Sequence, residues 1–244
     1  MFSAMNKPLM SNISERFERI QESIRNTCDQ AGRNYNDVQL IVVTKSAPYE
    51  AVKEIMSLGH AHFGENHAQQ LKKVDALLHD EPILQGRLPD IQWHMIGHLQ
   101  RNKVKQVLPL ASLIHSVDTL RLAEEINDCA TKLKKNVRIL LQVNTSNEPQ
   151  KYGVPVGAAT HLAEQLETLP NVELKGLMTM APLTRNKDVV RSCFARAKEI
   201  FDEMSGERLV GPQFTELSMG MSSDYEVAIQ EGATLLRIGS AIFA

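Results

Sequence analysis

The sequence predicts an α/β protein, specifically a single (β/α)8 barrel of the TIM type with an extra N-terminal helix. Eight short apolar stretches alternate with helical stretches along the 244 residues. Strict β/α alternation implies parallel strands joined by right-handed crossovers. Eight such units in roughly 250 residues is the usual size of this barrel. A doubly wound open sheet is the competing architecture, but it usually has a glycine-rich turn after its first strand. This chain has Thr-Lys-Ser-Ala-Pro at that point, at residues 44–48.

Each element follows from local signals in the chain. The first helix has Ile13, Phe17, Ile20 and Ile24 at helical spacing and ends before Gly32, a typical C-cap residue. The predicted strands cover residues 38–45, 61–63, 91–97, 113–118, 137–144, 174–180, 215–219 and 234–238. The predicted helices cover residues 11–31, 49–58, 67–78, a basic stretch from about 102, 119–134, 156–169, 188–204 and 223–231. Residues 81–90 contain two prolines and a glycine and are predicted to form a loop.

Composition excludes several classes of protein. The formal net charge is −2 and no basic block is present, which argues against a nucleic-acid partner. The three cysteines are scattered and odd in number, so we expect neither a disulfide framework nor a metal site. This cysteine pattern is typical of a protein in the reducing cytosol. Residues 1–10 lack a signal-peptide core, and no run of 18 apolar residues exists, so we expect no membrane association. Residues 1–244 are therefore predicted to form one cytoplasmic domain.

Lys45 ends the first strand, directly after a run of Val, Leu and Ile residues. A lysine at the end of a buried strand is costly unless it is paired, neutral or reacted. Burial lowers the pKa of a lysine, which is the condition for forming a Schiff base with an aldehyde. The alternative is that Lys45 lies past the strand and faces water.

The ends of the last two strands resemble a phosphate site. Barrels often bind phosphate with the loops after strands seven and eight and a nearby helix N-terminus. Gly220 permits close approach of a ligand, and Ser222 or Ser223 is predicted to N-cap the helix that follows. Gly239 and Ser240 supply a second set of donors after the next strand. The alternative is that residues 220–224 have only a structural role, as a turn followed by a helix cap.

Arg237 shares a strand face with Leu235 and Gly239 by alternation. Arginine cannot lose its charge, so it needs a partner inside a barrel. That partner is either a carboxylate such as Glu216 or an acceptor atom on a ligand. An aldehyde for Lys45, a phosphate for the loops and an acceptor for Arg237 together describe pyridoxal 5′-phosphate (PLP), although another phosphorylated ligand, as in a phosphosugar-binding barrel, also fits the residues.

Seven segments resemble the YggS/PROSC family of pyridoxal phosphate homeostasis proteins and extend in order from near residue 12 to the C-terminus. They are Leu-Ile-Val-Val-Thr-Lys at 40–45, Phe-Gly-Glu-Asn at 63–66, Trp-His-Met-Ile-Gly-His-Leu-Gln at 93–100, Ser-Val-Asp at 116–118, Gly-Leu-Met-Thr-Met-Ala-Pro at 176–182, Leu-Ser-Met-Gly-Met-Ser at 217–222 and Arg-Ile-Gly-Ser-Ala-Ile-Phe at 237–243. The chain departs from the family pattern only in small ways, such as Tyr152 within Lys-x-Gly.

The resemblance implies a barrel similar to the N-terminal domain of alanine racemase. It also implies a Schiff base between Lys45 and the cofactor PLP. The cofactor-binding residues that it implies are Lys45 for the aldehyde, Ser222, Gly239 and Ser240 for the phosphate, Arg237 for the ring nitrogen, and Asn66 nearby.

The residues favour a carrier over an enzyme, so we predict no catalytic residues. Arg237 cannot accept the proton that stabilises a carbanion on the cofactor ring. Racemisation needs acid/base groups on both faces of the substrate carbon. Alanine racemase brings one of these from a second domain, and this chain ends as the barrel closes. His94, His98 and Tyr225 are candidate bases, better explained as packing or hydrogen-bonding residues.

We therefore expect a PLP carrier that buffers or delivers the cofactor inside the cell, as a monomer or weak dimer, with PLP-dependent apo-enzymes as candidate recipients. The alternative is a weak PLP-dependent racemase or transaminase.

Overall fold

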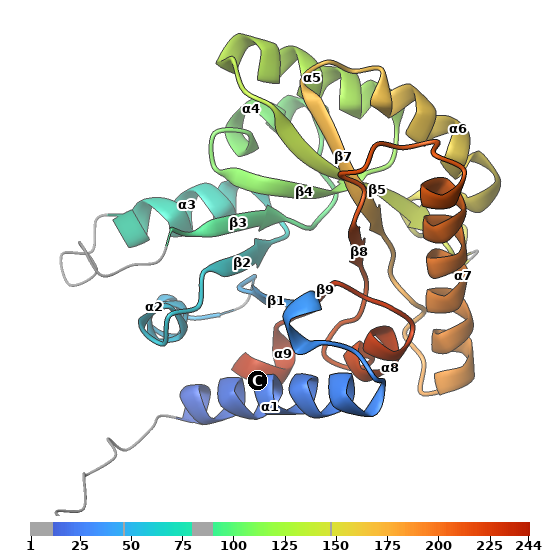
Figure 1. Ribbon diagram of the computed structural model, residues 1–244. Coiled ribbons are helices and arrows are strands. Elements are labelled where there is room, and N and C mark those ends of the chain that lie inside the picture. The colour runs from blue at the N-terminus through green and yellow to red at the C-terminus, as the bar shows by residue number, and fades with distance from the viewer. Residues whose placement is uncertain (1–11, 46, 80–89, 147) are drawn as a thin grey trace, which may run out of the picture.

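The computed structural model describes residues 12–45, 47–79, 90–146 and 148–244. Parallel strands form a closed barrel surrounded by helices (Figure 1). The strands are β1 (Gln39–Val43), β2 (His62–Glu65), β3 (Gln92–Met95), β4 (Ala111–Val117), β5 (Val137–Asn144), β6 (Val154–Pro155), β7 (Val172–Met178), β8 (Glu216–Ser218) and β9 (Leu235–Ile238). The helices are α1 (Asn12–Gln30), α2 (Tyr49–Ser57), α3 (Ala68–His79), α4 (Val104–Val107), α5 (Leu120–Leu133), α6 (Val156–Glu167), α7 (Lys187–Gly206), α8 (Tyr225–Gln230) and α9 (Ser240–Phe243), with 3-10 turns η1 (Tyr35–Asp37) and η2 (Arg101–Lys103).

The barrel closes because the sheet has no free edge within the ring. Its strand order is β4-β3-β2-β1-β9-β8-β7-β5, and β4 also pairs with β5. The two-residue strand β6 pairs with the end of β5 outside this ring. The predicted (β/α)8 barrel is confirmed, and all eight predicted strands are present.

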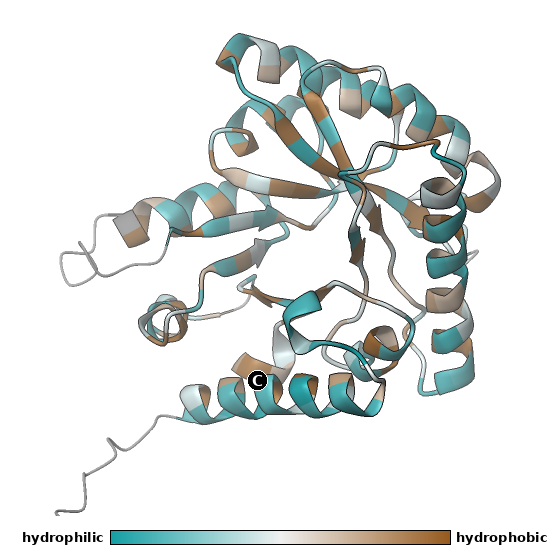
Figure 2. Ribbon diagram, in the orientation of Figure 1, coloured by the Kyte–Doolittle hydropathy of each residue, from teal (hydrophilic) through white to brown (hydrophobic). Residues whose placement is uncertain are grey.

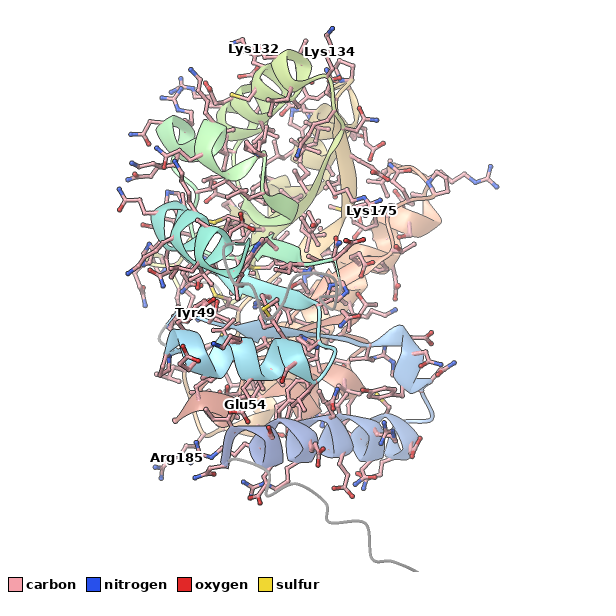
Figure 3. The ribbon with its side chains drawn as sticks, turned by 90° about the vertical axis from the view of Figure 1, so that its left-hand side faces the viewer. Tyr49, Glu54, Lys132, Lys134, Lys175 and Arg185 are labelled. Atoms are coloured by element: carbon pink, nitrogen blue, oxygen red, sulfur yellow. The ribbon has the colours of Figure 1, made fainter. Side chains whose placement is uncertain are left out.

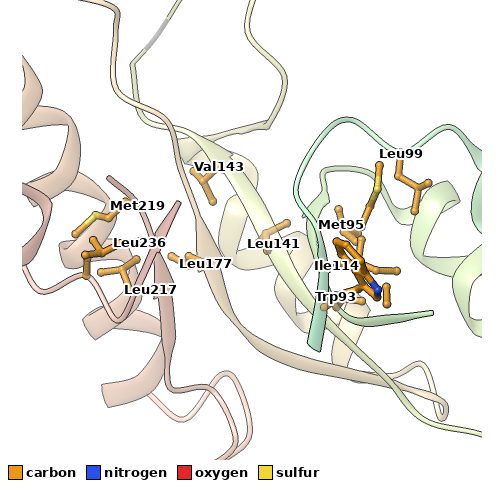
Figure 4. Packing of buried hydrophobic residues seen from close by; sticks show 14 of the residues in the cluster. Trp93, Met95, Leu99, Ile114, Leu141, Val143, Leu177, Leu217, Met219 and Leu236 are labelled. Atoms are coloured by element: carbon orange, nitrogen blue, oxygen red, sulfur yellow. The ribbon is translucent and has the colours of Figure 1, made fainter. Parts of the chain in front are cut away.

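Two hydrophobic cores hold the barrel together, because strand residues alternate between its two faces. Ile41, Leu113, Leu140, Met178 and Leu235 form a buried cluster inside the barrel. The larger cluster lies between strands and helices. Figure 4 shows part of it, with Trp93, Met95, Ile114, Leu141, Val143, Leu177, Leu217 and Leu236 among its labelled members. In Figure 2 the hydrophobic colours follow the strands and one side of α1.

The extra N-terminal helix α1 is present and packs against α2, α8 and α9. Its buried side chains include Phe17, Ile24 and Cys28. The C-terminal helix α9 lies beside α1 (Figure 1). Charged side chains such as Lys132, Lys134 and Arg185 lie at the periphery (Figure 3). No helix of the described residues is long and apolar enough to span a bilayer.

Some predicted boundaries were wrong. The basic helix expected from about residue 102 is only the turn η2 followed by the four-residue helix α4. Pro109 explains this early end, because proline has no N–H with which to continue the helical hydrogen bonds, although Leu108 before it is still helical in conformation. The loop predicted at residues 81–90 lies mostly outside the described residues.

Candidate functional site at the carboxyl ends of the strands

Lys45 lies just after β1, at the rim where the carboxyl ends of the strands gather. The side chain is exposed, so the expectation of a buried lysine was wrong and the water-facing alternative describes this residue. Its neighbour Thr44 is buried and donates its hydroxyl proton to Glu65 Oε1 at 2.5 Å. Lys45 is therefore held at the rim by an anchored preceding residue, and solvent or a small ligand can reach its amine.

Glu65 is a buried acid at the end of β2. It has no exposed surface, and burial raises the pKa of its carboxyl group. Its second oxygen, Oε2, has no hydrogen-bond partner among the described residues. The sequence places Glu65 at a strand end beside the predicted Asn66, but its side chain was assigned no role in the site.

The predicted phosphate residues come together across two loops. Ser222 Oγ accepts hydrogen bonds from the backbone N–H groups of Gly239 at 3.3 Å and Ala241 at 3.2 Å. Ser240, between these two donors, is the exposed first residue of α9. Two backbone donors therefore converge on one oxygen, which is the arrangement that binds a phosphate oxygen.

Neither Ser222 nor Ser223 caps the helix that follows, so that prediction was wrong. The short helix α8 begins at Tyr225 without a side-chain cap. Asp224 Oδ1 accepts from the N–H of Met221 instead, at 2.5 Å. Ser222 links its loop to α9, a partner far along the sequence, and local capping rules cannot identify such a contact.

Gly239 is required for close packing against β1. A Cβ atom at this position would lie 2.8 Å from the carbonyl oxygen of Val43 and 3.1 Å from its Cβ. Strands β1 and β9 pair in parallel with Val42 beside Ile238. This pairing brings the loop after β9 next to the end of β1, and hence next to the segment that carries Lys45.

Arg237 points into the barrel and is almost fully buried. Its Nη1 donates to Ser218 Oγ at 2.5 Å and its Nη2 to the carbonyl oxygen of Thr179 at 2.9 Å. Burial lowers the pKa of the guanidinium to about 10, an effect that Asp224 opposes, so Arg237 stays charged at neutral pH.

The carboxylate alternative for Arg237 does not hold in the described structure. Glu216 Oε2 accepts from the hydroxyl of Thr234 instead. No described carboxylate forms an ion pair with the guanidinium, whose hydrogen bonds go to neutral oxygens. A buried cation with neutral partners can therefore still attract a ligand acceptor.

Asn66 is partly buried and lines a cavity of about 500 Å³ together with Gly97, His98 and Tyr152. His98 stacks on Tyr152, with ring centroids 4.1 Å apart. The cavity opens beside the end of β2, next to the strand that leads to Lys45. Asn66 thus directly follows β2, the strand that pairs with β1.

The other candidate bases are occupied elsewhere. The hydroxyl of Tyr225 pairs with Ser23 of α1 at 2.9 Å. His94 is buried inside the barrel between two other histidines, His62 and His115. No group of three His, Cys, Asp or Glu residues in the described part of the chain is arranged to hold a metal ion.

Comparisons with known proteins place this fold in the class of alanine racemase-type barrels. Residues 17–244 match the family model of the alanine racemase N-terminal domain. A pyridoxal phosphate homeostasis protein of Aquifex aeolicus is 40% identical over 233 residues, which cover 95% of this chain and 97% of that protein.

Two solved structures agree. An unknown protein from Bifidobacterium adolescentis has a TM-score of 0.89 and 32% identity, covering 99% of this chain and 98% of that one. PipY of Synechococcus elongatus, with PLP bound, has a TM-score of 0.80 and 33% identity, covering 95% of this chain and all of that one. The chain belongs to the family of pyridoxal phosphate homeostasis proteins, which confirms the resemblance found in its sequence.

Proposed function

We propose that this protein binds PLP reversibly and acts in PLP homeostasis, as a buffer or delivery protein inside the cell and not as an enzyme. The observation that carries the proposal is the convergence of three groups at neighbouring strand ends. These groups are the accessible amine of Lys45, the paired N–H donors around Ser222 and the buried charge of Arg237. The printed names of the relatives and the PLP bound in PipY support it.

Each residue fits one part of PLP. Lys45 would hold the aldehyde covalently through its ε-amino group, and Ser222, Gly239 and Ser240 would hold the phosphate. Arg237 would donate to the ring nitrogen, and Asn66 would lie beside the ring. Bound PLP supplies an electron sink to an amino-acid substrate.

Arg237 also supports the carrier role. Arginine donates hydrogen bonds and does not accept them, so the ring nitrogen facing it stays unprotonated. An unprotonated ring is a weak electron sink, which disfavours carbanion chemistry. Tyr225 and His94, two of the candidate bases, have other partners. These properties suit loading and release better than turnover.

A weak racemase or transaminase is the second candidate, and one observation favours it. His98 and Tyr152 line the cavity beside Asn66, and both are exposed. Two such groups beside a bound cofactor could support slow α-proton exchange.

The first test measures binding and its site. Wild type with added PLP should develop the absorption band of a lysine-bound cofactor, and borohydride reduction followed by peptide mass analysis should locate the label on Lys45. Lys45→Ala should lose both signals, while Lys132→Ala, an exposed lysine on α5, should keep them. Labelling elsewhere, or an unchanged band in Lys45→Ala, would refute the proposal.

The second test separates carrier from enzyme. The loaded protein is mixed with a PLP-dependent apo-enzyme, and recovery of that enzyme's activity is compared with free PLP at equal concentration. Transfer at least as effective as free PLP supports delivery. Exchange of the α-hydrogen of any common amino acid well above the rate with free PLP would instead support the racemase or transaminase.

A further inference from the structure

A continuous chain of hydrogen-bonded side chains crosses the barrel interior and ends at Arg237. His62 Nδ1 lies 3.1 Å from His94 Nε2, and His94 Nδ1 lies 3.0 Å from His115 Nε2. His115 Nδ1 then lies 2.9 Å from Ser218 Oγ, which accepts from Arg237. These residues come from five different strands, β2, β3, β4, β8 and β9.

The far end of the chain lies at the opposite mouth of the barrel. His62 is the first residue of β2 and is partly buried. It lines a cavity of about 550 Å³ that also includes Gln39, Gln92 and Arg138, each at or near the start of its strand. The histidine chain therefore connects the amino ends of the strands with the buried guanidinium near the carboxyl ends.

The chain has a defined direction, because Arg237 can only donate hydrogen bonds. Among the described residues, Ser218 Oγ forms hydrogen bonds only with Arg237 Nη1 and His115 Nδ1. The Ser218 hydroxyl can therefore donate its proton only to His115 Nδ1. His115 then carries its proton on Nε2 and donates to His94 Nδ1, and His94 donates in the same sense to His62.

The surroundings hold this pattern in place. Burial lowers the pKa of His94 to about 3 and that of His115 well below its usual value, so both are neutral. A neutral imidazole has one donor and one acceptor, and both are used here. The neighbouring interior is the apolar cluster that contains Ile41 and Leu113. A reversed imidazole would leave the Ser218 proton unpaired in this apolar space, which is costly.

We propose that His62, His94 and His115 are positioning residues for the PLP ring: they fix the Ser218 hydroxyl so that its lone pair faces Arg237. The guanidinium is thereby held in one orientation before the ligand arrives. Packing alone would not require this, because leucine or methionine fills the same interior at Leu113 and Met178. The inference rests on the proposed function for the identity of the ligand, but the direction of the chain is a property of the protein by itself.

The first test needs no ligand. In protein labelled with 15N-histidine, His94 and His115 should each show a protonated Nε2 and an unprotonated Nδ1. The pattern should persist from pH 8 to pH 6. A protonated Nδ1 in His115, or titration of either ring near pH 6.5, would overturn the proposal.

The second test measures binding of 4-deoxypyridoxine 5′-phosphate, which keeps the ring nitrogen and phosphate but has no aldehyde for Lys45. Asparagine at position 115 places an amide oxygen near the position of Nδ1, whereas glutamine reaches only toward Nε2. His115→Asn should therefore stay within about threefold of wild type, and His115→Gln should weaken binding roughly tenfold, the loss expected for one misplaced hydrogen bond. Equal affinity in the two variants would overturn the positioning role.

Controls separate positioning from folding and from the proposed function. Adding Ser218→Ala to His115→Gln should cause no further loss, because both act through the same hydroxyl. His62→Leu, at the partly exposed end, is a milder change and should leave the proton of His94 on Nε2, because His115 Nε2–H still donates to His94 Nδ1. A proton on Nδ1 of His94 in a folded His62→Leu variant would contradict the chain. Failure of wild type to bind 4-deoxypyridoxine 5′-phosphate would refute the proposed function and, with it, the role of the histidines toward PLP. The tautomers of His94 and His115 would still report the direction of the hydrogen-bonded chain.

Discussion

The rim at the carboxyl ends of the strands and the interior of the barrel differ in how their polar side chains are used. At the carboxyl ends of the strands, Lys45 and Ser240 are exposed and available to a ligand. In the interior, His94 and His115 are buried and use both ring nitrogens in hydrogen bonds. Arg237 belongs to both regions, since it ends the histidine chain and faces the candidate PLP site. The residues available to a ligand thus lie at the rim, and the hydrogen-bonded polar residues that support Arg237 lie in the barrel interior.

The largest difference between these regions should appear in stability. His115→Ala leaves a cavity and removes a partner from His94 and from Ser218. We expect a loss of about 3 kcal/mol in the free energy of unfolding. Lys45→Ala, at the exposed rim, should change it by less than about 0.5 kcal/mol. Urea unfolding followed by circular dichroism measures both, and equal losses would remove the distinction.

The second largest effect should be a loss of stability at acid pH, caused by the buried histidine His94. His94 has a folded pKa of about 3 against 6.5 in the unfolded chain, so it stabilises fully above pH 6.5 and loses this contribution as the pH falls. Between pH 7 and pH 5 the loss is about 2 kcal/mol from this residue. Burial raises the carboxyl pKa of Glu65 and Asp224, which act in the opposite direction.

His94→Gln isolates the histidine contribution, because the carboxyl groups are common to both proteins. The difference in unfolding free energy between wild type and this variant should shrink by about 2 kcal/mol on going from pH 7 to pH 5. A difference that stays constant over this range would mean that His94 titrates normally.

At the rim, Gly239 should matter for binding more than for stability. The extra Cβ of Gly239→Ala would press on the Val43 backbone and move the loop that carries the phosphate donors. We expect affinity for PLP to fall about tenfold, or ~1.4 kcal/mol. Gly157→Ala is the matched control: it lies in helix α6 with no atom within 4 Å of the added Cβ, so it should bind normally and gain up to about 1 kcal/mol of stability.

The sequence predicted the barrel well because strands such as β1 and β5 are rich in Val, Ile and Leu and are buried on both faces. It also placed the candidate site at the rim, because functional residues of barrels follow strand ends, and this placement stays a prediction. The alternation rule could have placed His94, His115 and Ser218 on the same inward face as Arg237. Their mutual contacts depend on register between strands, however, as with His94 beside Leu113, and no local pattern encodes that register.

The smallest effect should come from Ser222, whose partner on α9 was not predictable for the same reason. Ser222→Ala removes the oxygen that accepts from Gly239 and Ala241, but water or phosphate can replace it at these donors. We expect a loss of about 1 kcal/mol in PLP affinity, the usual contribution of one hydrogen bond. Affinity for pyridoxal, which lacks the phosphate, should not change, and Ser223→Ala at the exposed neighbouring position should bind both ligands like wild type. An equal loss for PLP and pyridoxal would show that Ser222 supports the loop and does not contact phosphate, which would leave Gly239 and Ser240 to hold the phosphate without it.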